Sequence, residues 1–250
     1  MNAAYSILFW LALALTSPPM FVLAVLIWLV TLPFDRNGRV LHQFTCFWGF
    51  MYFAFNPTFR ATVEHRERLP WRGPAVLVAN HEGMGDILLL FGLYRPFKWV
   101  SKAAAFRLPF IGWNMSLNRY VSLVRGDKQS IAKMMAECEA WLERGVPVMI
   151  FPEGTRSPDG NVQAFKDGAF KLAIAKKCPV IPIVITGSSE ALPKHGWVMK
   201  AFNRCRVKVL EPVPWDRYGE DVARLRDGVR QIIIDEKARM LGEEPSRAAA

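Results

Sequence analysis

Along most of this 250-residue chain, hydrophobic and polar positions form two kinds of pattern, short apolar runs and longer stretches with helical spacing. Short apolar runs predict buried strands, and longer stretches with apolar residues at helical spacing predict amphipathic helices. The expected strands are residues 74–80, 99–101, 120–124, 146–151, 180–186 and 206–210, and the expected helices are residues 87–93, 110–117, 128–144, 166–177 and 221–241. Strands that alternate with helices predict an α/β fold, with a mostly parallel sheet flanked by helices.

The front of the chain departs from this alternation and indicates an N-terminal membrane-binding helical element. No side chain before Asp35 is charged. The run is too long for the core of a signal peptide, and it has no basic n-region or cleavage site. Pro18 and Pro19 divide it into two pieces of about fifteen residues, each about 22 Å long as a helix, whereas a membrane-spanning helix needs about twenty apolar residues. One kinked span and a re-entrant hairpin both fit this pattern.

A second apolar run, residues 47–55, is rich in aromatic side chains and too short to span a membrane. Aromatic rings favour the headgroup level of a bilayer, so this run predicts an interfacial helix, with packing against the following domain as the alternative. The expected organisation is a hydrophobic membrane-associated helical segment over residues 1–60, an α/β domain over residues 61–241, and a flexible tail over residues 242–250.

The formal net charge of +10 is not uniform along the chain, and residues 35–73, beside the apolar front, hold a surplus of six arginines over three acidic residues. Basic residues next to a membrane segment predict a cytoplasmic location. We therefore expect the chain at a cell inner membrane or cytoplasmic membrane, with its catalytic domain on the cytoplasmic side. No nucleic-acid-binding motif is present. The four cysteines are widely separated, which predicts reduced thiols instead of disulfides or a zinc site.

Two short motifs carry candidate chemistry. Residues 80–86 read Asn-His-Glu-Gly-Met-Gly-Asp after one expected strand, and residues 151–157 read Phe-Pro-Glu-Gly-Thr-Arg-Ser after another. The carboxyl ends of parallel strands meet at one edge of a sheet, so the motifs can share a site. His81 is a candidate general base, and Asp86 can reach back across the glycine-containing loop to fix its tautomer. The guanidinium of Arg156 suits phosphate oxygens.

Other chemistries are less well supported by the sequence. No G-x-S-x-G elbow and no nucleophilic cysteine is evident, which favours direct attack by a hydroxyl of the substrate. The remaining histidines, His42, His65 and His195, form no metal-binding pattern, so no metal is expected. Each motif alone also fits a plainer interpretation: a polar loop ahead of a helix for residues 80–86, and a surface salt bridge for residues 151–157.

The two motifs and two further stretches resemble, in their order and their residues, the sequence blocks of the glycerolipid acyltransferase family, specifically the 1-acylglycerol-3-phosphate acyltransferases. Residues 80–86 are similar to its first block, residues 120–125 to its second, residues 151–157 to its third and residues 180–183 to its fourth. Residues 165–171 also resemble the stretch that follows the third block. The second block departs from the usual pattern, because the acidic residue expected before Arg125 is missing. The resemblance covers about residues 66–215.

The resemblance implies that a fatty acyl group passes from acyl-CoA or acyl-carrier protein to the sn-2 hydroxyl of lysophosphatidic acid, giving phosphatidic acid. It implies that His81 and Asp86 are catalytic. The residues implied in binding substrate are Glu153, Gly154, Thr155, Arg156, Arg125 and Lys102. The implied partners are a lysophospholipid acceptor, the acyl donor and a membrane bilayer, with no metal or bound cofactor. The same chemistry on lyso-ornithine lipid, another lysophospholipid or glycerol-3-phosphate stays open, as does a membrane-associated binding protein with a degenerate site.

Overall fold

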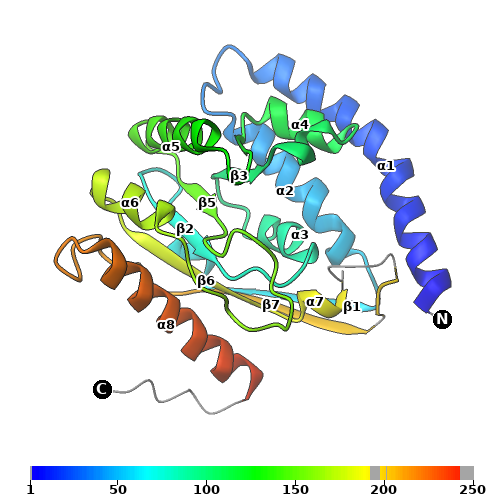
Figure 1. Ribbon diagram of the computed structural model, residues 1–250. Helices are drawn as coiled ribbons and strands as arrows, with labels where there is room; N and C mark the ends of the chain where they lie inside the picture. Colours follow the sequence, from blue (N-terminus) through cyan, green and yellow to red (C-terminus); the bar gives the residue numbers. More distant parts are fainter. Residues whose placement is uncertain (1, 192–197, 201, 243–250) are drawn as a thin grey trace.

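The computed structural model describes residues 2–191, 198–200 and 202–242. Within these residues the chain forms one sheet of seven strands, in the order β1-β7-β6-β2-β5-β3-β4 (Figure 1). The strands are β1 (Phe59–Glu64), β2 (Val76–Ala79), β3 (Lys98–Lys102), β4 (Val121–Leu123), β5 (Val148–Ile150), β6 (Val180–Thr186) and β7 (Asn203–Val209). Among the seven described strands, only β6 and β7 pair antiparallel. The predicted α/β fold with a mostly parallel sheet is therefore confirmed.

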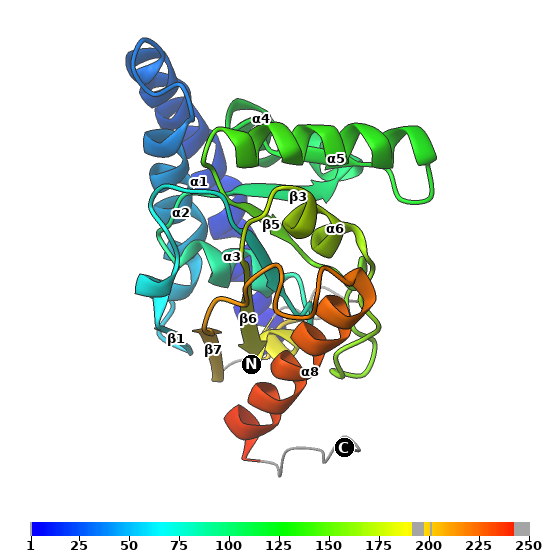
Figure 2. The same ribbon diagram turned by 90° about the vertical axis from the view of Figure 1, so that its left-hand side faces the viewer.

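Helices cover both faces of the sheet (Figures 1 and 2). The α-helices are α1 (Asn2–Thr31), α2 (Arg39–Ala54), α3 (Gly85–Phe91), α4 (Ile111–Leu117), α5 (Lys128–Glu143), α6 (Gly168–Ala175), α7 (Ser188–Ala191) and α8 (Val222–Leu241), and the short 3-10 helices are Arg66–Arg68 and Ala103–Arg107. Alternate residues of β2 point to opposite faces. Leu77 therefore joins the core beneath α2 and α3, whereas Val76 and Val78 join the core beneath α5, α6 and α8.

Helix α1 runs without a break through Pro18 and Pro19, so of the two alternatives left open by the sequence the structure favours a single span over a hairpin turning at the prolines. Proline has a helix-compatible φ, and hydroxyl groups beside it can bond to the backbone of the preceding turn. Thr16 and Ser17 do this, donating at 2.6 Å to the carbonyls four residues earlier. The chain instead turns after α1 and returns as α2, which packs against it (Figure 2). By length and composition, residues 3–31 could cross a membrane.

Helix α2 packs between α1 and α3, and its buried side chains include Trp48 and Phe53. A Cβ atom at Gly49 would lie 2.3 Å from the ring of Phe91 on α3, so the glycine permits this close approach. The structure thus supports packing against the domain for most of residues 47–55. Phe47 and Phe55 nevertheless remain exposed.

Two other features differ from expectation. Strand β1 was not predicted; it pairs in parallel with β7 at one edge of the sheet, and the expected domain boundary between residues 60 and 61 falls inside it. Except for Gly242, the predicted tail over residues 242–250 lies outside the described residues, and so does His195.

Candidate active site

The loop between β2 and α3 brings His81 and Asp86 together. Asp86 lies in the first turn of α3, and its Oδ2 accepts a 2.7 Å hydrogen bond from Nδ1 of His81. The same oxygen accepts the backbone N–H groups of Glu82 at 2.7 Å and Gly83 at 3.0 Å. Asp86 is completely buried. Because the carboxylate can only accept, Nδ1 carries the proton and Nε2 of His81 is left able to take one.

The imidazole ring is also fixed by its neighbours in the β-sheet layer. Phe151, from the second motif, stacks on the ring of His81 with centroids 3.9 Å apart and planes 11° from parallel. Trp99 of β3 lies on the other side of Phe151, at 5.6 Å between centroids. One face of the imidazole is therefore covered, and His81 is only 8% exposed.

The side chain of Asn80 allows the loop that carries His81 to leave the sheet at the end of β2. Where β2 ends, the Asn80 amide takes over the pairing with β6: Nδ2 donates to the Ile185 carbonyl at 2.9 Å, and Oδ1 accepts the Ile185 N–H at 2.8 Å. A side chain thus satisfies backbone groups that the departing strand would leave unpaired. These two hydrogen bonds fix the backbone position of the residue that directly precedes His81.

Glu153 ties the two motifs together. Its Oε1 accepts the backbone N–H of His81 at 2.7 Å, and its Oε2 accepts that of Gln163 at 3.0 Å. The backbone N–H of Ser157 donates in turn to the His81 carbonyl at 2.7 Å. Burial raises the pKa of Glu153, and the two backbone hydrogen bonds oppose that rise. These bonds give Glu153 a positioning role, and its expected contact with substrate stays a prediction.

The turn after Glu153 presents the remaining residues of the second motif. Gly154 has φ +70°, which favours glycine, and a Cβ atom there would lie 2.9 Å from Nζ of Lys166. Thr155 is exposed and Arg156 is half-buried. The turn therefore places Thr155 and Arg156 at the carboxyl end of β5, and the expected contacts of Gly154, Thr155 and Arg156 with substrate stay predictions.

Lys102 and Arg125 lie farther along the same edge. Lys102 ends β3, which neighbours β5, and Arg125 follows β4, one strand beyond. Both side chains are exposed. Among the described residues, neither side chain forms a hydrogen bond or an ion pair with His81 or Asp86, so their roles in binding phosphate stay predictions.

Three functional candidates were missed in the sequence. Ser188, at the start of α7, donates a hydrogen bond from its hydroxyl to Oδ1 of Asp86. Lys237 of α8 forms an ion pair with Glu82 at 2.5 Å between Nζ and Oε1, and it also donates to the Gly160 carbonyl. All three side chains are buried. Burial raises the pKa of Glu82, while the Lys237 charge opposes that shift.

The signals for these residues differ in strength. Ser188 follows an expected strand at the same sheet edge as His81, so topology alone could have suggested it. Lys237 is one charged residue on a long amphipathic helix, and nothing local marks it. Its contact depends on how α8 packs across the sheet.

Metal ligation has little support in this region. Across residues 2–191, 198–200 and 202–242, no group of three or more His, Cys, Asp or Glu side chains is placed to hold a metal ion. All four cysteines are buried. The prediction that no metal or cofactor is bound stays a prediction.

Comparison with known proteins identifies relatives of this chain. The sequence model of the acyltransferase family matches residues 60–186, which contain both motifs. A 1-acyl-sn-glycerol-3-phosphate acyltransferase of Chlamydomonas reinhardtii is 38% identical over 230 residues, covering 91% of this chain and 68% of that protein. The chloroplastic enzyme of that name from Brassica napus is 33% identical over 204 residues, covering 81% and 58%. This chain thus spans about three fifths of the length of the Brassica protein.

Bacterial proteins give a similar result. The 1-acyl-sn-glycerol-3-phosphate acyltransferase of Pseudomonas aeruginosa is 29% identical over 199 residues, covering 78% of this chain and 76% of that protein. The crystal structure of the 1-acyl-sn-glycerophosphate acyltransferase of Thermotoga maritima superimposes with a TM-score of 0.77 over the whole of both chains, at 23% identity. That likeness supports the fold.

Proposed function

This chain belongs to the acyltransferase family, and on that premise we propose that it is a membrane-bound O-acyltransferase that acylates the sn-2 hydroxyl of lysophosphatidic acid. The acyl donor is acyl-CoA or acyl-carrier protein, and the product is phosphatidic acid. The resemblance read from the sequence blocks is confirmed at the level of the family and of the enzyme class. The observation that carries the proposal is the buried His81–Asp86 pair, joined at 2.7 Å.

The dyad supports the following sequence of steps. Nε2 of His81 takes the proton of the acceptor hydroxyl while that oxygen attacks the thioester carbonyl, forming a C–O bond. The C–S bond breaks as the tetrahedral intermediate collapses, and His81 returns the proton to the departing thiolate. Asp86 holds the productive tautomer and stabilises the imidazolium between these steps. No covalent enzyme intermediate is needed.

Basic residues along the sheet edge supply the complementary charge. The acceptor and both donors carry phosphate groups, and a guanidinium binds phosphate through two parallel hydrogen bonds. Arg156 belongs to the turn that Glu153 and Ser157 tie to the His81 backbone, so we assign it to the acceptor phosphate. We assign Gly154 and Thr155 of the same turn to substrate binding as well, and Arg125 and Lys102 extend the positive surface.

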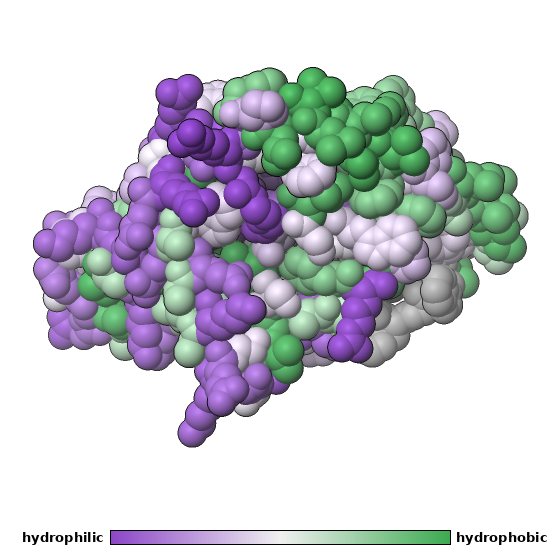
Figure 3. Space-filling view, turned by 90° about the horizontal axis from the view of Figure 1, so that it is seen from above, coloured by the Kyte–Doolittle hydropathy of each residue, from purple (hydrophilic) through white to green (hydrophobic). Residues whose placement is uncertain are grey.

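Helix α1 supports the membrane location. Its inward stripe packs on α2 and α4, with Phe21 contacting the rings of Phe110 and Trp113. Its outward residues are exposed leucines, isoleucine and valines, which appear as an apolar surface on the side of α1 and α4 (Figure 3). Large exposed apolar surfaces mark contact with lipid or protein. The arginines that follow α1 favour a cytoplasmic membrane face.

A purified-enzyme assay tests the proposal. The full chain in neutral detergent is supplied with labelled acyl-CoA or acyl-carrier protein, and with lysophosphatidic acid, other lysophospholipids, lyso-ornithine lipid or glycerol-3-phosphate. We expect turnover of lysophosphatidic acid that His81→Ala abolishes, whereas His65→Ala, at an exposed histidine, retains it. Wild-type turnover by His81→Ala would refute the mechanism. Turnover of a different acceptor alone would keep the reaction and refute the substrate.

A further inference from the structure

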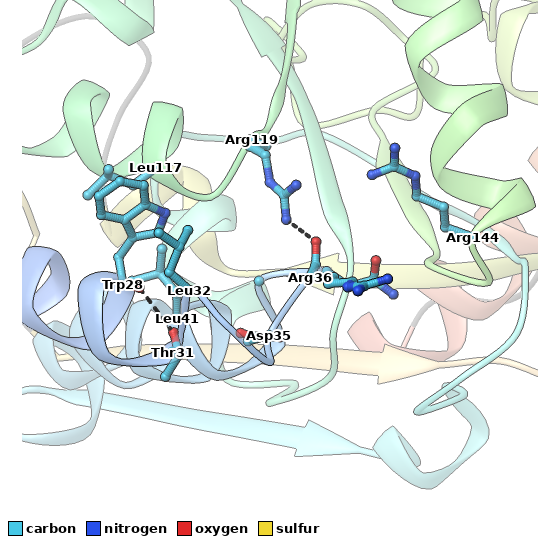
Figure 4. A pocket seen from close by; sticks show the side chains of 11 residues that line it. Trp28, Thr31, Leu32, Asp35, Arg36, Leu41, Leu117, Arg119 and Arg144 are labelled. Carbon is cyan, nitrogen blue, oxygen red and sulfur yellow. Dashed lines mark hydrogen bonds between the residues drawn. The ribbon is translucent and has the colours of Figure 1, made fainter.

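A cavity of about 620 Å³ lies near the amino ends of the parallel strands, whereas the His81–Asp86 pair lies at their carboxyl ends. Its lining residues are shown in Figure 4. Arg119 and Arg144, two of its lining residues, precede β4 and β5, whereas the residues of the candidate active site follow the parallel strands. The turn between α1 and α2 forms another wall and contributes Arg36. The volume falls in the range typical of sites for small molecules. The cavity is therefore separate from the acyl-transfer centre.

The lining of the cavity is divided into a cationic end and an apolar end. Arg119 and Arg144 approach the same space from α4 and α5, and Arg119 donates a hydrogen bond to the Arg36 carbonyl (Figure 4). Trp28, Leu32 and Leu117 line the opposite end. Such a lining matches a ligand that carries an anion at one end and a hydrocarbon portion at the other.

Positive charge is in excess around this cavity. Asp35 is the only acidic side chain among the described lining residues, and its oxygens already accept the N–H groups of Arg39 and Val40, each at 2.8 Å. Arg119 and Arg144 both lie 5.1 Å from the ring of Trp141, over which a lysine also sits. Like charges gathered at close range repel one another, so a bound anion would stabilise the arrangement.

That lysine is Lys98, which lies behind the arginines. It is 1% exposed, donates to the Asn118 carbonyl at 2.7 Å and sits 4.5 Å from the Trp141 ring centroid. Burial, followed by the Arg119 charge, lowers its pKa to about 7. Among the described residues no carboxylate forms an ion pair with Lys98; its direct contacts are a carbonyl and a ring, and the more distant Asp35 charge only partly opposes the fall in its pKa.

The position of the apolar end identifies the ligand class. It adjoins the last turns of α1, where Leu29, Leu32 and Phe34 are exposed. If α1 contacts the bilayer, as the proposed function requires, this end lies where lipid chains enter. We propose that the cavity binds the phosphate headgroup of an anionic membrane phospholipid, with Arg119 and Arg144 on the phosphate and Trp28 and Leu32 along the lipid. The inference rests on the proposed membrane location and is independent of the reaction.

Photo-crosslinking of the unmodified full chain tests this site without a mutation. The probe is a phosphatidylglycerol with a photoactivatable acyl chain, because that lipid is anionic and is not the product of the proposed reaction. In neutral detergent, labelled peptides should map to residues 28–41 and 117–144. A phosphatidylcholine probe of the same chain should label them far less. Labelling confined to residues 80–86 and 151–157, or equal labelling by both probes, would overturn the proposal.

Substitutions test whether Arg119 and Arg144 bind the lipid phosphate. Arg119→Gln/Arg144→Gln should weaken binding of short-chain phosphatidylglycerol by about tenfold or more, because two charge-assisted contacts are lost. Arg217→Gln/Arg224→Gln removes the same charge elsewhere and should leave binding unchanged. Should the first variant not fold, Asn37→Glu, which places a carboxylate in the lining, should weaken binding similarly. Unchanged binding in the folded variant refutes the assignment.

Two further measurements separate the possible sources of failure. Inorganic phosphate at millimolar concentration should not displace short-chain phosphatidylglycerol; equal displacement would show a free-phosphate site and refute the lipid. The variant of Arg119 and Arg144 should retain turnover of lysophosphatidic acid in neutral detergent. If the wild-type chain crosslinks the lipid at this site but does not acylate lysophosphatidic acid, the result would refute the proposed function and leave the lipid site supported.

Discussion

Replacing Asp86 with asparagine removes one charge from the centre of the candidate active site and hardly changes its shape. Oδ2 accepts three N–H groups, from His81, Glu82 and Gly83, whereas Oδ1 accepts the hydroxyl of Ser188. An asparagine NH₂ at the Oδ2 position would meet three donors. The amide will therefore place its oxygen there and turn its nitrogen towards Ser188, whose hydroxyl can accept instead.

The loss expected in Asp86→Asn follows from the charge. The neutral amide still holds the ring of His81 but stabilises the imidazolium much less. Charge-assisted hydrogen bonds contribute about 1.5–3 kcal/mol, which sets a lower bound of about 10- to 100-fold. The same change in a Ser-His-Asp triad lowers kcat by about 10⁴-fold, or about 5.4 kcal/mol. We expect kcat to fall by about 10²- to 10⁴-fold.

Initial rates with labelled donor and saturating lysophosphatidic acid measure this effect. KM should change little, because Asp86 is completely buried and cannot touch the lipid. Asp127→Asn is the matched control, since Asp127 caps α5 and asparagine caps a helix equally well. A variant that melts at the wild-type temperature and keeps kcat within about tenfold would refute the assigned role of Asp86.

Three further substitutions have defined outcomes. Ser188→Ala should lower kcat by about 10- to 100-fold at constant KM, because Asp86 loses a donor; an unchanged kcat would exclude this positioning role. Lys237→Met should lower the free energy of unfolding by about 3–5 kcal/mol in denaturation experiments, because it leaves Glu82 unpaired, and adding Glu82→Gln should restore part of the loss. The pKa of Lys98 is about 7 when folded and 10.5 ordinarily, so the folded state binds fewer protons between these pH values. Wild-type stability should therefore rise with pH across that window by at most about 1.4 kcal/mol per unit, and Lys98→Met should flatten the rise in thermal denaturation at pH 7 and 9.5.

Local sequence patterns were sufficient for much of the fold. Strand β6 is buried at every position and appears in the sequence as a continuous apolar run, while α5 carries its apolar residues on one stripe. The two motifs were found because each follows such a strand, and parallel topology brings those strand ends to one edge. The His81–Asp86 contact then followed from a loop of known length.

The errors have physical causes that act over longer distances. Strand β1 is an edge strand in which only Phe59 is buried, so its hydrophobic signal is weak. Helix α1 continues through Pro18 and Pro19, which a propensity argument treats as a break. Lys237 reaches Glu82 across 155 positions of sequence, a contact fixed by tertiary packing alone.

The restricted environment of His81 suggests why such a site would transfer the acyl group to a lipid hydroxyl instead of hydrolysing the donor thioester. Phe151 covers one face of the imidazole, and Asp86 occupies Nδ1, so a hydroxyl must approach Nε2 from the open edge. Water competes with the acceptor for the same thioester. The 8% exposure of His81 leaves little room for an activated water beside it, and an acceptor held by Arg156 would fill that room. Selectivity for transfer would then come from the same packing that orients the base.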